Sequence, residues 1–185
     1  MDMLSAEQAA QALKEAAAAE RRSANAYHYD QSAPYCFLWG IVWLLGYGAQ
    51  ALFPPGPWLG WWWMGLSMTG AAVSAVIGRR QNVRRPGMSW RIGVVFLIIW
   101  LFTFALFAVL HPKSPLQIGA YFPLLFAAIY AALGLWMGLR YILVGVFMAV
   151  STLGAYFYMR EYFFHWMALV GGGSLLLTGL WMRRA

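Results

Sequence analysis

Charged residues are scarce in this 185-residue chain, and acidic residues are the scarcest of them. Asp, Glu, Lys and Arg make up 10% of the sequence, with only six acids, whereas hydrophobic residues make up 62%. Soluble domains average about 25% charged residues, so this composition excludes an ordinary soluble globule. The formal charge of +7 comes from basic residues beside apolar runs, where they orient a protein in a membrane. We therefore expect a lipid bilayer as the environment and no nucleic acid as a partner.

Residues that could catalyse a reaction, bind a metal or carry a charge through the membrane are equally scarce. The single cysteine, Cys36, permits neither an internal disulfide nor a cysteine-based metal cluster. No Asp, Glu, Lys or Arg lies in the middle of any long apolar run, although ion-coupled transporters usually keep one at that depth. The chain also has no Ser/His/Asp set, His-Glu-x-x-His motif or glycine-rich phosphate loop. We expect neither an enzyme, nor a cofactor, nor an ion-coupled transporter.

What the sequence does contain is six apolar runs of membrane-spanning length. A helix of about 20 apolar residues crosses a hydrocarbon core of about 30 Å, and the runs lack the alternation typical of membrane β-strands. The predicted fold is therefore an all-α integral membrane protein. A cytoplasmic, Ala-rich helix in residues 1–33 precedes six transmembrane helices in residues 34–185, and Gly138–Arg140 forms a tight turn. The runs are Cys36–Phe53, Trp58–Gly78, Ile92–Leu110, Gln117–Met137, Tyr141–Met159 and Phe164–Met182.

Basic residues predict the orientation of these helices. With six spans, eleven Lys and Arg residues fall on one side, whereas Lys113 and Arg160 are the two on the other side. Cytoplasmic loops retain Lys and Arg, so both termini are expected in the cytoplasm. Eleven of the thirteen bases are arginine, which hints at a GC-rich bacterial genome and hence at a bacterial inner membrane. The eleven are Lys14, Arg21, Arg22, Arg79, Arg80, Arg84, Arg85, Arg91, Arg140, Arg183 and Arg184.

The N-terminal segment is the part able to fold in water. Ser5 and Gln8 form a plausible capping box, and alanine with Glu, Gln, Lys and Arg dominates the stretch to about Tyr27. Its apolar face is mainly alanine plus Leu13, and such a face is not hydrophobic enough to bind a bilayer strongly by itself. Residues 1–33 carry a net charge of −2, and the loop around Arg79–Arg91 carries five bases. We expect this helix to contact that loop or a protein partner.

Small residues recur on the second, fourth and sixth runs at helical spacing. Gly70 and Ser74, and Gly134 and Gly138, are four residues apart, a spacing that lets helix backbones approach closely. Ala127 and Ala131 extend the face of Gly134 in the fourth run at the same helical spacing. We interpret these faces as packing surfaces inside the bundle, with a homodimer interface or a narrow path as alternatives. The spans can also be read as three tandem hairpins whose returning helices end in arginine. Chance similarity among apolar sequences remains the competing explanation for that repeat.

Two groups of residues are candidates for binding a ligand or lining a path. Gln50 shares a helix face with Tyr47 and Trp43, which makes a stripe of amide and aromatic groups. Gly171, Gly172 and Gly173 lie next to Ser174 in the sixth run, where consecutive glycines weaken a helix and broken helices of transporters expose backbone groups. An interhelical hydrogen bond for Gln50, and an intact, closely packed sixth helix, are the structural alternatives.

Aromatic and histidine residues mark the outer surface. Trp58 and Trp61–Trp63 follow a proline-rich turn, and we interpret them as membrane anchors, with a hydrophobic ligand as the alternative. Pro123 predicts a kink in the fourth helix. His111 and His165 both fall on this side and are weak candidates for haem or metal ligation, because no cysteine or carboxylate joins them.

Two functions follow. The first is a non-enzymatic scaffold, regulatory or assembly protein that acts through helix contacts with a second copy, a membrane protein or a cytoplasmic protein. The alternative is a small uncoupled transporter or channel around Gln50 and Gly171–Gly173.

Overall fold

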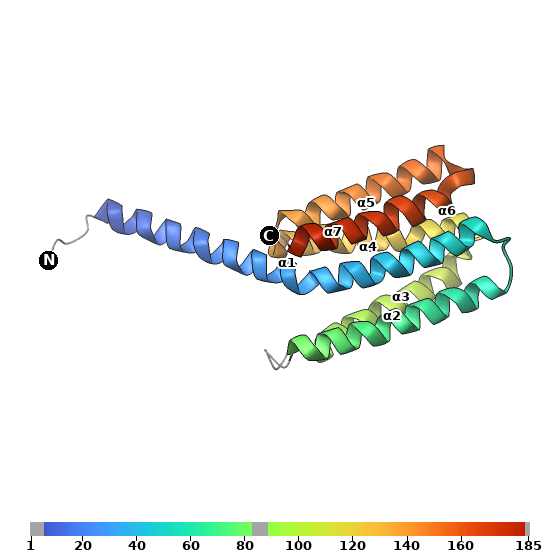
Figure 1. Ribbon diagram of the computed structural model, residues 1–185, viewed down its shortest axis with the longest axis horizontal. Coiled ribbons are helices and arrows are strands. Elements are labelled where there is room, and N and C mark those ends of the chain that lie inside the picture. The colour runs from blue at the N-terminus through green and yellow to red at the C-terminus, as the bar shows by residue number, and fades with distance from the viewer. Residues whose placement is uncertain (1–5, 83–88, 184–185) are drawn as a thin grey trace.

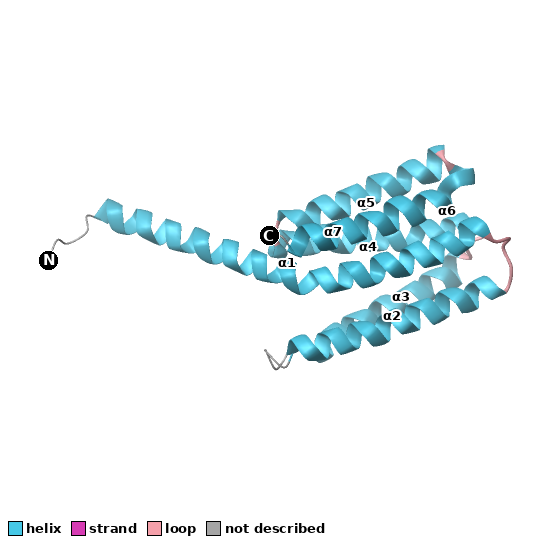
Figure 2. Ribbon diagram, in the orientation of Figure 1, coloured by secondary structure: helices cyan, strands magenta, loops and turns pink. Residues whose placement is uncertain are grey.

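The computed structural model describes residues 6–82 and 89–183, and every regular element in these ranges is helical (Figure 2). Arg84, Arg85 and Arg184, which entered the predicted orientation, lie outside them. The helices are α1 (Ala6–Leu52), α2 (Trp58–Asn82), α3 (Ser89–Leu110), α4 (Pro115–Met137) and α5 (Leu139–Tyr158). A last rod changes its winding from the 3₁₀-helix η1 (Arg160–Tyr162) to α6 (Phe163–Trp166), the π-helix η2 (Met167–Gly172) and α7 (Gly173–Arg183).

Four of these helices are long and apolar enough to cross a membrane. They are the second half of α1 (Ala26–Leu52), α4, α5 and the last rod over Arg160–Arg183. These helices indicate a membrane location, and the all-α prediction is confirmed for the described residues. The predicted spans in α2 and α3 stay predictions. α2 is long enough, but its tryptophans, glycines and serines lower its mean hydropathy. In α3, the part whose side chains are described gives an apolar helix of Leu97–Leu110, which is shorter than a span.

The link between α4 and α5 is a single residue, Gly138. Its φ of 112° lies in a region that side chains other than hydrogen disfavour, which explains why a glycine ends α4 here. We expected Gly138 both in the tight turn and on the packing face, and its place in the structure is the turn. α4 begins equally sharply, because Ser114 and Gln117 form a capping box around Pro115 at the first helical position.

The rods run side by side, and the two ends of the bundle differ in character (Figure 1). The last turns of α2 and α7 and the first turn of α5 lie at one end, which carries Arg79, Arg80, Arg183 and Arg140. We name it the arginine end. The opposite end, where residues 53–57 join α1 to α2, is named the tryptophan end. The end of α3, Lys113 and Arg160 belong to the tryptophan end.

The core consists of α1, α4, α5 and the last rod, and the α2–α3 pair lies along one side of it (Figure 1). The most extensive contacts join α4 to α5 and α1 to the last rod. α3 packs on α4 through aromatic contacts of Trp100 and Phe107 with Phe122. The closest partners therefore come from different predicted hairpins, and the tandem-hairpin repeat stays a prediction.

Glycines let the core helices touch through their backbones. A Cβ placed on Gly145 of α5 would lie 2.6 Å from the carbonyl oxygen of Ala127 and 2.7 Å from the nitrogen of Ala131 in α4. A Cβ on Gly134 of α4 would lie 2.7 Å from the nitrogen of Ile142 in α5. These three α4 residues belong to the small face that we interpreted as internal packing, so the face is used between α4 and α5. We name this contact the α4–α5 glycine contact.

A second backbone contact joins α1 to the π-helix. A Cβ on Gly172 would lie 2.9 Å from the nitrogen of Leu44 and 3.0 Å from the carbonyl oxygen of Gly40. A Cβ on Gly40 would in turn lie 3.1 Å from the carbonyl oxygen of Gly172. Because both glycines lack a side chain, the two helices approach more closely here than two side-chain layers would allow. We name this contact the α1–η2 glycine contact.

α1 extends well beyond the bundle at its N-terminal end (Figure 1). The side chains of residues 10–20 are all exposed, whereas Tyr29 and Ala33 are buried against Tyr141 and Met182. The helix is continuous through the predicted boundary at residues 33 and 34, and packing begins within the segment assigned to water. Pro34 lies inside α1, and a proline inside a helix removes a backbone hydrogen bond and favours a kink.

The α4–α5 glycine contact predicts a specific stability loss. Gly145→Ala places a methyl group against the α4 backbone, so the free energy of unfolding should fall by about 1–3 kcal/mol. Gly154→Ala on the same helix is the matched control, because a Cβ there meets no atom within 4 Å. Thermal unfolding in detergent measures both variants. Equal midpoints for the two would contradict the contact.

Candidate functional site

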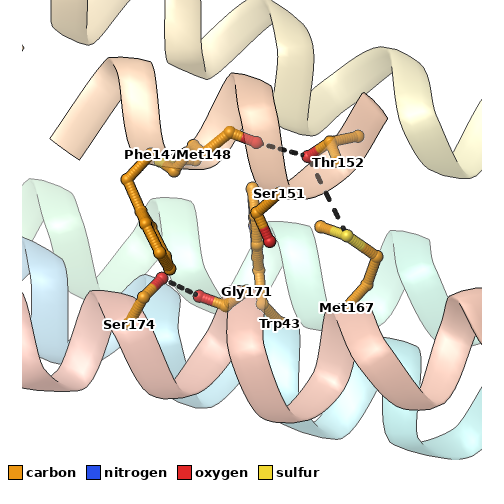
Figure 3. Close-up of a pocket in the computed structure, with 8 residues that line it drawn as sticks. All are labelled: Trp43, Phe147, Met148, Ser151, Thr152, Met167, Gly171 and Ser174. Carbon is orange, nitrogen blue, oxygen red and sulfur yellow. Dashed lines mark hydrogen bonds between the residues drawn. The ribbon is translucent and has the colours of Figure 1, made fainter. Parts of the chain in front are cut away.

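Three of the predicted site residues meet in one crevice at the centre of the bundle. Trp43 of α1 and Gly171 and Ser174 of the last rod face Met148, Ser151 and Thr152 of α5 (Figure 3). Gly171 packs on Trp43, since a Cβ there would lie 3.3 Å from the indole ring. Ser151 and Thr152 were not among the predicted site residues. The sequence could not show that these α5 residues lie beside Trp43 of α1, because only the tertiary packing of the helices brings them together.

The hydroxyl groups of this crevice already have partners. The Thr152 hydroxyl donates to the carbonyl oxygen of Met148 at 2.7 Å and lies 3.9 Å from the sulfur of Met167. The Ser174 hydroxyl donates to the carbonyl oxygen of Gly171 at 3.0 Å. The indole N–H of Trp166 donates to the Ser151 hydroxyl at 2.9 Å. Serine and threonine in membrane helices commonly bond to their own backbone, as Thr152 and Ser174 do here, so each hydroxyl group of the crevice has a partner within the bundle.

The crevice also leaves no room for a water molecule. A conducting path needs a continuous polar or hydrated space, so the described conformation is closed at this level. The permease alternative stays a prediction and requires α5 and the π-helix to move apart.

The glycine triplet changes the winding of the last rod without breaking it. Gly171 and Gly172 end a six-residue π-helix, and Gly173 continues into α7 with ordinary helical angles of φ −61° and ψ −41°. π-helical turns are rare and often occur at functional sites, but here Gly171 contacts Trp43 and Gly172 contacts α1. A Cβ on Gly173 would meet no atom within 4 Å. The first two glycines therefore serve close packing, and the third has no packing role.

Tyr47 repairs the hydrogen bond that Pro123 removes. A proline has no N–H, so the carbonyl of Gly119, four residues earlier, loses its helical donor. The buried Tyr47 hydroxyl donates to this carbonyl oxygen at 2.7 Å. Pro123 is itself fully buried, and a free carbonyl at this depth would be costly. The predicted ligand residue Tyr47 thus joins α1 to the kink in α4.

Gln50 lies outside the crevice, on the side of it that faces the tryptophan end. Its side-chain oxygen accepts a hydrogen bond from the indole N–H of Trp63 at 3.0 Å, which is the interhelical bond that we set against a ligand role. The same side chain also lines a cavity of about 160 Å³. Gln50 is therefore separated from Gly171–Gly173, and the predicted set divides into two places.

Two further predictions concern packing and metal. Gly70 faces the indole ring of Trp39 on α1, and the Ser74 hydroxyl is buried without a hydrogen-bond partner. His111 follows the last residue of α3 and has a φ of 44°, and both His111 and His165 are exposed. Within residues 6–82 and 89–183, no group of three or more His, Cys, Asp or Glu side chains is placed to hold a metal ion.

Sequence reasoning missed a polar and aromatic cluster at the arginine end. The Tyr141 hydroxyl bonds to the Ser32 hydroxyl and donates to the carbonyl oxygen of His28 at 3.2 Å. Arg140 donates to the carbonyl oxygen of Trp181 at 2.7 Å and lies over the rings of Tyr29 and Trp181. These contacts tie α1, α5 and α7 together. The Arg140–Tyr141 pair at the start of a span was a usable signal, because aromatic and basic residues anchor helix ends.

No family profile, curated protein or solved structure matches this chain.

The Tyr47 bond predicts a coupled pair of variants. Tyr47→Phe leaves the Gly119 carbonyl without a donor and should lower the free energy of unfolding by about 1–2 kcal/mol. In a Pro123→Ala background the new N–H at position 123 bonds to Gly119, so the same change should cost much less. Tyr158→Phe, at a residue that is 88% exposed, is the control. A Tyr47→Phe cost that is equal in both backgrounds would show that the two residues are uncoupled.

Proposed function

We propose that this chain is a six-span protein of a bacterial inner membrane, with both termini in the cytoplasm, that assembles or regulates other proteins through helix contacts and catalyses no reaction. The proposal rests mainly on one observation. The N-terminal part of α1 extends beyond the bundle, and the side chains of residues 10–20 are exposed.

The projecting part of α1 lacks the side-chain burial that normally stabilises a helix in a protein. Helices of fewer than about 12–15 residues are marginal in water, and longer helices in proteins depend mainly on tertiary packing. The projecting part buries no side chain over residues 10–20, and Leu13, 72% exposed, is its one large apolar residue there. Alanine faces allow another helix to approach closely. A helical partner that covers this face would supply the missing packing.

The closed centre of the bundle favours assembly over transport. The crevice between Trp43, α5 and the π-helix excludes water, and its hydroxyl groups are bonded internally. No Asp, Glu, Lys or Arg lies in the middle of a predicted span, and ion-coupled transporters usually keep such a residue at that depth. These features support a static bundle whose active surface lies outside it.

The two ends of the bundle support the proposed orientation. Arg79, Arg80, Arg140 and Arg183 lie at the arginine end, from which the N-terminal part of α1 also projects. Retention of basic residues in the cytoplasm then assigns this end, and the projecting helix, to the cytoplasmic side.

Cysteine labelling tests six spans against four. In a Cys36→Ala background, Ala10→Cys, Arg79→Cys and Lys113→Cys are treated with a membrane-impermeant maleimide in spheroplasts. Six spans predict labelling of Lys113→Cys from outside, and labelling of the other two only after permeabilisation. Labelling of Arg79→Cys from outside would mean that α2 and α3 do not cross the membrane.

Photo-crosslinking tests the docking role of α1. A photoreactive amino acid replaces Leu13, and the matched control replaces Leu135 of α4, because these side chains are 72% and 73% exposed. We expect a protein adduct at position 13 in intact cells and no protein adduct at position 135, which faces outward from the bundle. Deletion of residues 1–25 should leave the bundle inserted and abolish association with the partner found at position 13. Absence of a protein adduct at position 13 would refute the docking role.

A further inference from the structure

A cavity at the tryptophan end has the size and lining of a site for an apolar chain. Its volume is about 160 Å³, and its walls include Phe53, Leu59, Leu116 and Phe164. An apolar cavity of about 150 Å³ accepts a benzene-sized molecule. The volume of this cavity is therefore enough for a short stretch of hydrocarbon.

One polar group interrupts the apolar wall, and its orientation is determined. Gln50 lines the cavity and accepts the indole N–H of Trp63 through its side-chain oxygen at 3.0 Å. An amide whose oxygen is engaged in this way presents its two N–H donors on the other side. The cavity therefore offers donors beside an apolar chamber, and this combination selects a ligand that carries a hydrogen-bond acceptor next to a hydrocarbon chain.

The tryptophans at the tryptophan end indicate that the ligand is a membrane lipid. Trp58 and Trp61, 37% and 71% exposed, lie at the same end of the bundle, and such side chains belong at the boundary between hydrocarbon and headgroups. The ester carbonyls of a phospholipid lie at that boundary, directly above its acyl chains.

Lys113 and Arg160, the basic residues placed at the tryptophan end, are close in sequence to residues that line the cavity. Lys113 precedes the lining residue Pro115 by two positions, and Arg160 precedes the lining residue Phe164 by four. Both side chains are exposed, so they are available to a phosphate group, which attracts Lys and Arg.

We propose that this cavity binds one phospholipid molecule, with the upper part of an acyl chain in the chamber, an ester carbonyl on the Gln50 amide, and the phosphate near Lys113 and Arg160. The site requires this end of the bundle to lie at a membrane interface. It does not depend on the proposed docking role of α1, so either proposal can fail without the other.

The first test fills the chamber. Leu59→Trp adds bulk to the cavity wall, and Met68→Trp places the same side chain on α2 at a residue that is 63% exposed. The full-length protein in mild detergent is titrated with dioleoyl phosphatidylglycerol, and bound lipid is counted by native mass spectrometry. We expect Leu59→Trp to weaken binding by tenfold or more and Met68→Trp to bind like the wild type. Binding by Leu59→Trp at the wild-type level, or equal weakening in both variants, would overturn the site.

The second test isolates the Gln50 amide and does not depend on Leu59→Trp being folded. The wild type should bind the diester lipid roughly three to ten times more tightly than its diether analogue, as expected for one hydrogen bond. Gln50→Met keeps the chain length but has no donor, so it should bind the two lipids equally. A preference for the diester that survives in Gln50→Met, or no preference in the wild type, would exclude the amide as the ester ligand.

Discussion

Direct contact between helix backbones is the constraint on which this bundle depends. Helices in lipid gain little from burying apolar side chains, since the surrounding lipid is equally apolar, so they associate by close packing and polar contacts. The α4–α5 and α1–η2 glycine contacts provide that packing. Each joins two of the four helices that are apolar enough to span a membrane. A side chain at Gly145 or Gly172 would separate a pair and loosen the core that both pairs share.

Close packing also determines how the polar groups are used. Pro123 removes a donor from the Gly119 carbonyl, and Tyr47 replaces it from the neighbouring helix. Ser151, Thr152 and Ser174 are bonded within the bundle, and the crevice between them excludes water. The Tyr47–Gly119 and Trp166–Ser151 bonds therefore join different helices, whereas the hydroxyl groups of Thr152 and Ser174 bond to the backbone of their own helix. Among the described residues, the projecting part of α1 and the cavity beside Gln50 are two surfaces open to other molecules.

Local features of this fold could be predicted from the sequence, whereas helix pairing could not. Four of the apolar runs became helices of spanning composition, and Gly138 formed the predicted turn because it permits a positive φ. The packing role of Ala127, Ala131 and Gly134 followed from their spacing. The partner of each face did not, since Tyr47 meets Gly119 across 72 residues. Gln50 and Gly171 were expected to act together, but they lie in different places. They were chosen by residue type, which does not show whether two residues meet in the bundle.

The bundle is closed at its centre, and the N-terminal part of α1 projects from it. Hydrogen–deuterium exchange of the protein in lipid nanodiscs tests both parts at once. Amides of residues 10–20 should exchange within seconds in the absence of a partner, because the side chains of this part of α1 are all exposed. Amides of Met167–Gly172 should stay protected, because the crevice beside the π-helix excludes water. Exchange in Met167–Gly172 as fast as in residues 10–20 would contradict the closed bundle.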